Sequence, residues 1–265
     1  MKTVHYTSGL PRACSSLLQN LLAQNPQVHA TATSGVHEIG YIARGFFDTE
    51  EFKTFKNPLD GERQYYNFLR GGIQSAYNSQ TDRPIVVDKC RSWVGHLDQL
   101  FKVFPDAKVL VPVRDVRGIL TSLEKKWAQH PSRFTGVEKA NPQNWTTVEK
   151  RAQGWLSIPP LSIALERVHE AVRTHKGRLH FVHAEDLTND PQKTMNKVWQ
   201  YLGMEVVVHN TENVAQYTTE QEIGFPYGDH EIRPKIEPLP KEWNEVLGRG
   251  LSNAIATKFQ WINDL

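Results

Sequence analysis

Cysteine is scarce in this sequence: only Cys14 and Cys90 occur among its 265 residues. Two cysteines make no disulfide framework, and without a C-x-x-C pair they give no zinc signature. Long apolar runs are missing as well. No stretch approaches the roughly 18 apolar residues of a transmembrane helix, and Met1 to His5 lead into a predicted strand without an apolar leader. We therefore expect a soluble, cytoplasmic protein with no membrane span and no metal site.

Charge of one sign is not in excess. The 31 Lys and Arg residues against 29 Asp and Glu residues leave a net charge of +2, and no basic block stands out. This composition predicts no nucleic-acid partner, but it is compatible with a local basic pocket, because net charge says nothing about clustering. No internal repeat of roughly 20–50 residues is evident, so a solenoid is not expected.

The most informative stretch is residues 7–18, with the sequence TSGLPRACSSLL. The alternating run Lys2 to Tyr6 before it predicts a strand, and leucines at 17, 18, 21 and 22 predict an amphipathic helix that Pro26 closes. The chain is therefore expected to form a strand, a tight turn and a helix. Such a turn aims free backbone N–H groups and the positive end of the helix dipole at one point, where a phosphate or sulfate fits.

The spacing in this turn differs from that of a Walker A loop, G-x-x-x-x-G-K-[ST]. Counted from Gly9, the second glycine position holds Cys14 and the lysine position holds Ser15. A bound triphosphate would lose its main cation, which disfavours ATP or GTP hydrolysis. The cation that is present, Arg12, lies inside the turn.

Strands alternate with helices through residue 203, which predicts an α/β fold: a single three-layer domain over 1–265 with a mainly parallel sheet flanked by helices. The predicted strands are 2–6, 28–33, 85–87, 107–113 and 178–182. The predicted helices include 41–57, 62–78, 93–104, 146–173 with an interruption at Pro159-Pro160, 191–202 and 241–262, with a long loop over 128–145 and an irregular segment over 204–240.

Polar or charged residues follow each predicted strand. Ligands of open parallel sheets bind beyond the carboxyl ends of the strands, so we expect these side chains to converge on one crevice. They are Arg12, Ser34 to Glu38, Lys89, Arg114 and Glu185.

Two of these stretches resemble the cofactor-binding loops of sulfotransferases that use 3′-phosphoadenosine-5′-phosphosulfate (PAPS). The run GLPRxxSSLL from Gly9 resembles their 5′-phosphosulfate loop, in which the family usually has Gly where this chain has Cys14. The run VRDVR from Val113, with Ser122 eight residues after Arg114, resembles their 3′-phosphate site.

The resemblance extends over residues 3 to 238. Residues 88–93 and 104–108 look like the middle of prokaryote-type and protein-tyrosine sulfotransferases. Residues 185–191 look like the family's E-D-L…P element, which usually has Tyr where this chain has Ala184. Ile232-Arg233-Pro234-Lys235 resembles the basic part of a C-terminal loop that closes over the nucleotide, here within 204–240.

This resemblance implies a P-loop-type fold and an in-line transfer of the sulfuryl group from PAPS to a hydroxyl or amine acceptor, with the desulfonated nucleotide PAP as product and no metal. Arg12 and Lys89 would then face the transferring sulfonate and the leaving oxygen, where cations offset the developing negative charge. The implied cofactor-binding residues are Arg12, Ala13, Cys14, Ser15, Ser16, Leu17, Arg114, Ser122, Arg233 and Lys235.

A base must take the acceptor's proton. Glu38 is our prediction, because it follows the second strand, where the protein-tyrosine branch carries its glutamate; His37 is the competitor. Two other functions stay open: a P-loop nucleotide kinase, which would consume ATP with magnesium, and a catalytically silent protein that keeps only the nucleotide site. The acceptor, a small molecule, glycan or peptide, and the oligomeric state are not predicted.

Overall fold

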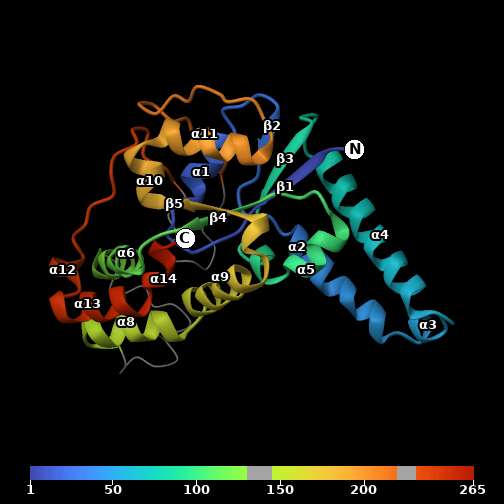
Figure 1. The fold of residues 1–265 in the computed structure, drawn as a ribbon, viewed down its shortest axis with the longest axis horizontal. Helices are drawn as coiled ribbons and strands as arrows, with labels where there is room; N and C mark the ends of the chain where they lie inside the picture. Colours follow the sequence, from blue (N-terminus) through green and yellow to red (C-terminus); the bar gives the residue numbers. More distant parts are fainter. Residues whose placement is uncertain (130–144, 220–230) are drawn as a thin grey trace.

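A parallel β-sheet forms the centre of the computed structural model, which describes residues 1–129, 145–219 and 231–265 (Figure 1). Within these ranges the sheet has five strands in the order β2-β3-β1-β4-β5. They are β1 (Thr3–Thr7), β2 (Val28–Ala30), β3 (Ile85–Lys89), β4 (Val109–Val113) and β5 (Leu179–His183). All neighbouring pairs are parallel, and the central strand β1 pairs with β3 and with β4. The predicted parallel sheet is confirmed.

Helices connect the strands and close the chain. In the described ranges they are α1 (Ser15–Leu22), α2 (Val36–Ile42), η1 (Ala43–Asp48), α3 (Glu50–Lys53), α4 (Pro58–Asn78), η2 (Trp93–Gly95), α5 (Leu97–Val103), α6 (Val116–Gln129), α8 (Val148–Ser157), α9 (Leu161–His175), η4 (Lys176–Arg178), α10 (Ala184–Asn189), α11 (Pro191–Leu202), α12 (Trp243–Val246), α13 (Arg249–Lys258) and α14 (Gln260–Asn263), where η marks a 3₁₀ helix.

The sheet is buried on both faces, as the predicted three layers require. Consecutive strand residues point to opposite faces, so Val86 and Val87, both fully buried, belong to different cores. Leu18 of α1 and Trp199 of α11 pack in the core of one face, and Val168 of α9 packs in the core of the other. Figure 1 shows α1, α10 and α11 on one side of the sheet and α6, α8 and α9 on the other.

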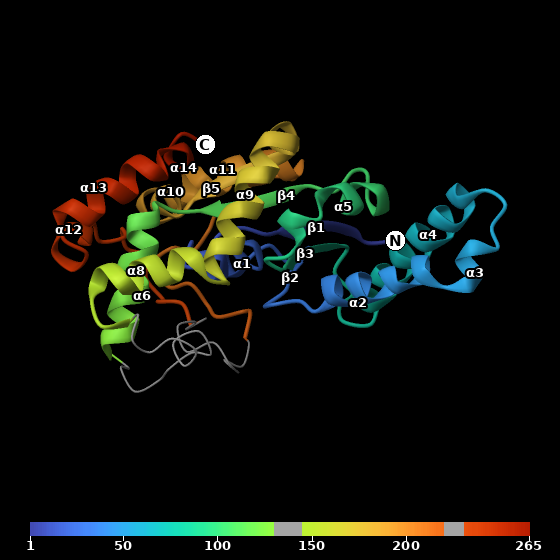
Figure 2. The same cartoon turned by 90° about the horizontal axis from the view of Figure 1, so that it is seen from below.

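Helices α2, α3 and α4 lie at the end of the molecule opposite α12 and α13 (Figure 2). The predicted helical segment over 41–57 is broken: the end of α2, the 3₁₀ helix η1 and the short α3 cover most of it in place of one helix. Phe46, Phe47 and Phe52 contact one another with ring centroids 4.9–5.8 Å apart, and Phe47 contacts Tyr65 of α4 at 4.7 Å. A single straight helix would spread these rings along its length, so their packing against α4 overrides the helical pattern.

Other predicted helices are interrupted. Backbone angles of φ −136° and ψ 37° at His96 separate η2 from α5 within 93–104. Gly248, at φ 80°, separates α12 from α13 within 241–262, a conformation that glycine adopts readily. The predicted break between α8 and α9 at Pro159-Pro160 is confirmed. Of the predicted loop over 128–145, Ala128 and Gln129 still belong to α6, and residues 130–144 lie outside the described residues.

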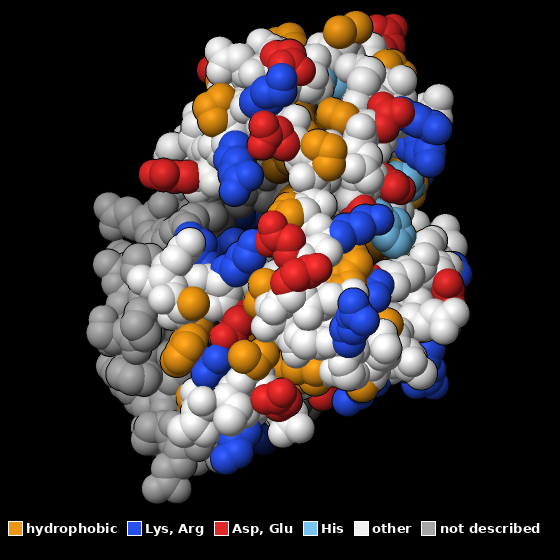
Figure 3. Space-filling view, turned by 90° about the vertical axis from the view of Figure 1, so that its left-hand side faces the viewer, with side chains coloured by type: hydrophobic (Ala, Val, Ile, Leu, Met, Phe, Trp, Pro, Cys, Tyr) orange, Lys and Arg blue, Asp and Glu red, His pale blue; other side chains and the backbone are white. Residues whose placement is uncertain are grey.

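The charges of the surface are mixed. On the described residues of the side that carries α12 and α13, Lys and Arg side chains are interspersed with Asp and Glu (Figure 3). No helix in the described part of the chain combines the length and the apolar character of a membrane span. The same ranges hold no group of three or more His, Cys, Asp or Glu side chains placed to bind a metal ion.

Candidate active site

A cavity of about 820 Å³ opens where the strands β1, β3 and β4 end. Its described walls come from the loop after β1, from strand ends, from helices and from a C-terminal segment. They are residues 7–12 and 14–17, Thr33, residues 89–91, Arg114, parts of α6, the junction of α8 and α9, Thr188, and residues 231–233 and 235–240. In the sheet, β2, the next strand in sequence, lies on one side of β1, and β4 lies on the other side. The loop after β1 therefore occupies the point at which the strand order reverses, the switch point of the sheet. Ligands of such sheets bind at this point.

The loop after β1 has a strained backbone. Arg12 and Cys14 have φ values of 59° and 57°, in the left-handed region that costs a residue other than glycine roughly 1–2 kcal/mol. This conformation turns the chain into α1, whose first backbone N–H groups have no partners inside the helix. It also explains why glycine suits position 14. Burial raises the pKa of the Cys14 thiol, which therefore stays neutral.

Close packing against β4 fixes the start of this loop. Leu10 N donates to the carbonyl oxygen of Pro112 at 2.9 Å. A Cβ on Gly9 would overlap that same oxygen, so only glycine allows the approach. Pro112 lies inside β4, paired in register with Val182 of β5. Because its nitrogen and oxygen both face the loop, the missing N–H removes no bond between β4 and β5.

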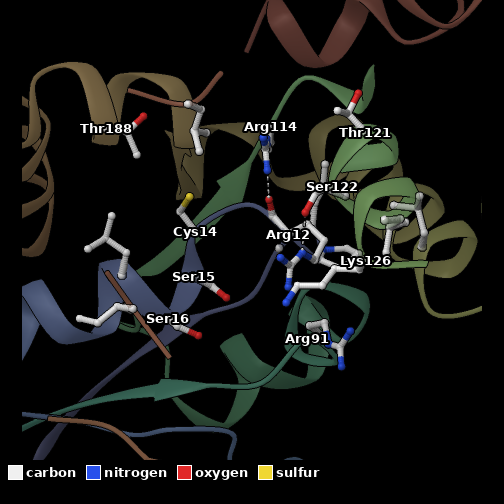
Figure 4. A pocket seen from close by; sticks show the side chains of 18 of the residues that line it. Arg12, Cys14, Ser15, Ser16, Arg91, Arg114, Thr121, Ser122, Lys126 and Thr188 are labelled. Atoms are coloured by element: carbon white, nitrogen blue, oxygen red, sulfur yellow. Dashed lines mark hydrogen bonds between the residues drawn. The ribbon is translucent and has the colours of Figure 1, made fainter. Parts of the chain in front are cut away.

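The two stretches singled out in the sequence meet directly. Arg12 Nε donates to Ser122 Oγ at 3.0 Å, across 110 residues of chain. In Figure 4, Arg12, Ser122 and Lys126 converge, and the hydroxyls of Ser15 and Ser16 point toward the same space. The loop after β1 and the helix after β4 therefore form one continuous cationic surface.

Arg114 lies behind the loop. Its side chain is 10% exposed, one terminal nitrogen donates to the carbonyl oxygen of Arg12 at 3.0 Å, and its Nε lies 4.0 Å from Glu185 Oε1 (Figure 4). Its buried Nε has no hydrogen-bond partner among the described residues. Arg114 thus holds the strained backbone of Arg12 in place and keeps donor capacity at the edge of the cavity.

Lys89 enters the cavity from the end of β3. The residue is 7% exposed, and its backbone N–H donates to Thr31 Oγ1 at 2.8 Å. The preceding Asp88 points to the other face, where it accepts a hydrogen bond from Trp93 Nε1 at 3.1 Å. Burial raises the pKa of Asp88. This network holds the end of β3 and so orients Lys89.

The other predicted cofactor residues have different positions. Arg233 and Lys235 line the cavity but stay exposed, with Lys235 Nζ 2.8 Å from Glu212 Oε2. The ion pair with Glu212 raises the pKa of Lys235. Leu17 also lines the cavity, whereas the Ala13 side chain packs in the core and leaves only its backbone to the loop.

Glu38 does not line the cavity. It belongs to α2, and its side chain is 63% exposed, with Oε1 at 3.3 Å from His37 Nδ1. His37 Nε2 lies 3.0 Å from His96 Nδ1, so both ring nitrogens of His37 are engaged. Burial, and next the neighbouring His96, lower the pKa of His37. The contact between His37 and His96 was not foreseen, since the two lie 59 positions apart in the chain.

Several cavity residues were missed by sequence reasoning. Lys126 follows Ser122 by four residues on α6, so helical periodicity alone places both on one face. Thr188, on α10, lies across the cavity from Lys126 in Figure 4. Arg91 follows Lys89 by two residues and also lines the cavity. No local signal marks Thr188.

The sequence profile of the Sulfotransferase family matches residues 7–207, which include both cofactor-type loops and β5. The chain belongs to this family. The match begins at the end of β1 and so covers every described part of the cavity wall except the segment 231–240.

Solved structures of bacterial sulfotransferases share the fold. The sulfotransferase domain of the Synechococcus PCC 7002 olefin synthase is 18% identical, with a TM-score of 0.56 over 98% of this chain and 96% of that one. The sulfotransferase domain of the curacin biosynthetic pathway is 12% identical, with a TM-score of 0.60 over 98% of each chain. A sulfotransferase from Alicyclobacillus acidocaldarius is 12% identical, with a TM-score of 0.51 over 99% of this chain and 96% of that one. No curated protein matched in a sequence comparison.

Proposed function

We propose that this sulfotransferase moves the sulfuryl group from PAPS to a hydroxyl or amine acceptor by in-line displacement. The observation that carries the proposal is the hydrogen bond between Arg12 and Ser122, which joins the loop after β1 and the helix after β4 into one anion site. That site presents hydroxyls and guanidinium groups and has no lysine at the Walker position. Its donors suit a sulfonate and two monophosphates better than a magnesium-bound triphosphate.

The residues present fit the nucleotide. Backbone N–H groups of residues 13–17 with the hydroxyls of Ser15 and Ser16 would hold the 5′-phosphate. Ser122, Arg233, Lys235 and the buried Nε of Arg114, which has no hydrogen-bond partner among the described residues, would serve the 3′-phosphate. We place residues 231–240 over the nucleotide as part of a covering loop within 204–240, the rest of which includes residues outside the described ranges.

The chemistry asked of the protein is charge stabilisation and proton removal. PAPS, when bound, supplies the activated sulfuryl group. Arg12 and Lys89 offset the negative charge that develops on the leaving oxygen, an effect worth about 3–4 kcal/mol for one well-placed donor. Positioning of both reactants in the cavity supplies the remainder.

Glu38 is the base we propose for the acceptor's proton. His37 is the weaker candidate, because both of its ring nitrogens are engaged and its pKa is lowered. An acceptor would have to extend from the cavity past Cys90, which lines it, to α2.

Calorimetric titration with PAP in magnesium-free buffer tests the cofactor. We expect the wild type to bind PAP with a micromolar or lower Kd, and Arg114→Ala to lose roughly 2–5 kcal/mol of binding free energy. Lys193→Ala, on the exposed start of α11, is the control and should bind as the wild type does. Absence of PAP binding together with binding of ATP and Mg²⁺ would put a nucleotide kinase in place of the sulfotransferase.

A further inference from the structure

Residues 211–218 and 231–240, called here the C-terminal strap, bring Arg233 and Lys235 to the cavity. Hydrogen bonds join the two arms of the strap: Val214 N to Pro234 O at 2.7 Å, Ile232 N to Gln216 Oε1 at 3.0 Å and Ile236 N to Thr211 O at 3.1 Å. The two arms therefore form one unit, and whatever holds the first arm also sets the place of the second.

Asn20 holds the first arm. This residue of α1 is fully buried, and its Oδ1 accepts the backbone N–H groups of Tyr217 at 2.6 Å and Thr218 at 3.0 Å. Its Nδ2 donates to Thr218 Oγ1 at 3.1 Å and to the carbonyl oxygen of Ser16 at 2.9 Å. All four hydrogen-bonding positions of the amide are used. One buried side chain thus links the first turn of α1, which follows the loop after β1, to the strap.

The helix itself has no need of this asparagine. Asn is a poor helix former in a helix interior, and burial of an amide costs free energy unless it is fully bonded. The neighbouring positions 21 and 22 of α1 are buried leucines. Three of the four bonds of Asn20 reach residues almost 200 positions away, so they satisfy the strap, and only the bond to Ser16 lies within the helix.

We propose that Asn20 is a positioning residue for the nucleotide: by fastening the strap to α1, it holds Arg233 and Lys235 at the wall of the cavity. The inference rests on the proposed function. A strap that is fastened in only a fraction of molecules raises the apparent Kd of a ligand by the inverse of that fraction. Loss of the Asn20 amide should therefore weaken nucleotide binding without any direct contact to the nucleotide.

The first test is titration of Asn20→Ala with PAP. Loss of the bonds leaves two backbone N–H groups of the strap without acceptors, so we expect the Kd to rise roughly ten- to thirtyfold. Gln192→Ala is the matched control. Gln192 of α11 also bridges backbone groups, those of Val207 at 2.9 Å and His209 at 2.8 Å, but it does so ahead of the strap. Its replacement should change the Kd by less than about twofold.

A double-mutant cycle separates positioning from a general loss of stability. If Asn20 acts through the strap, the effects of Asn20→Ala and Lys235→Ala will not multiply. We expect the rise in Kd of the double variant to be at least about fivefold smaller than the product of the rises in the two single variants.

The inference would be overturned if Asn20→Ala kept the wild-type Kd, or if its rise in Kd multiplied with that of Lys235→Ala. In either case, PAP binding by the wild type would still uphold the proposed function. No PAP binding by the wild type would overturn both. If Asn20→Ala does not fold, Thr218→Val tests the inference in its place. It removes one acceptor with little change of shape, and we expect a roughly two- to fivefold higher Kd; an unchanged Kd would count against the inference.

Discussion

Cys14 is the residue at which the chain departs most clearly from the resembling loop, and the structure shows the physical consequence. The residue adopts φ 57°, a left-handed conformation that glycine adopts readily and other residues adopt only with strain. Its side chain packs with the core that contains α1 and α11. Strain and packing therefore oppose each other at this position.

Paired substitutions at Cys14 separate strain from packing. Both Cys14→Gly and Cys14→Ala remove the thiol, but only glycine relieves the left-handed conformation. We expect Cys14→Gly to be more stable than Cys14→Ala by about 1 kcal/mol, the reverse of the order at most helical positions. Urea unfolding of the two variants measures the difference. An alanine variant at least as stable as the glycine variant would show that the loop relaxes on substitution.

At the scale of elements, the approach of the loop after β1 to β4 decides the shape of the site. Gly9 lies against Pro112 so closely that no side chain fits, and Pro112 tolerates its place in a strand because its nitrogen faces this loop. The strand-to-helix unit was predicted from its own residues. Its partner in β4 follows only from the sheet order.

Gly9→Ala should destabilise the fold by roughly 2–4 kcal/mol, since the new Cβ must displace backbone in a close-packed interior. Gly71→Ala on α4 is the matched control, because a Cβ there would meet no atom within 4 Å. That change should stabilise by up to about 1 kcal/mol through helix propensity. Thermal unfolding of both variants tests the pair, and equal effects of the two substitutions would refute this reading of the loop.

For the whole molecule, two buried histidines make stability depend on pH. The pKa of His209 is lowered from 6.5 to about 4 by burial, and that of His5 is lowered from 6.5 to about 4 by burial and next by Lys108. His209 Nε2 accepts a hydrogen bond from Trp199 Nε1 at 2.8 Å, which requires the neutral ring. Between these pKa values the unfolded chain binds more protons than the folded one, so stability is lost as the pH falls below about 6.5.

His209→Gln should reduce this pH dependence. Of the decrease in unfolding free energy between pH 7.5 and pH 5, His209 is expected to supply about 2 kcal/mol. Urea unfolding of wild type and variant at both pH values measures the difference between the two decreases, whatever the cost of the substitution itself. A variant with the same decrease as the wild type would mean that His209 is protonated without penalty.

Local patterns were sufficient for most elements. The bounds predicted for the helix over 191–202 are confirmed in α11, where Asp190 accepts the Lys193 N–H at 3.1 Å and Gly203 ends the helix at φ 74°. Such features depend on neighbours within a few residues. The predicted helix over 41–57 failed because its aromatic rings pack against α4, a contact that periodicity does not contain.

The sequence by itself determined the family, the alternation of strands and helices, and the types of most residues that line the cavity, because each depends on residues adjacent in the chain. Only the tertiary structure decided which of these residues meet. It brought Arg12 to Ser122, fastened residues 217 and 218 to Asn20, and left Glu38 outside the walls of the cavity. Contacts between distant segments depend on the order of the strands and on how helices pack across them, and no local pattern encodes either.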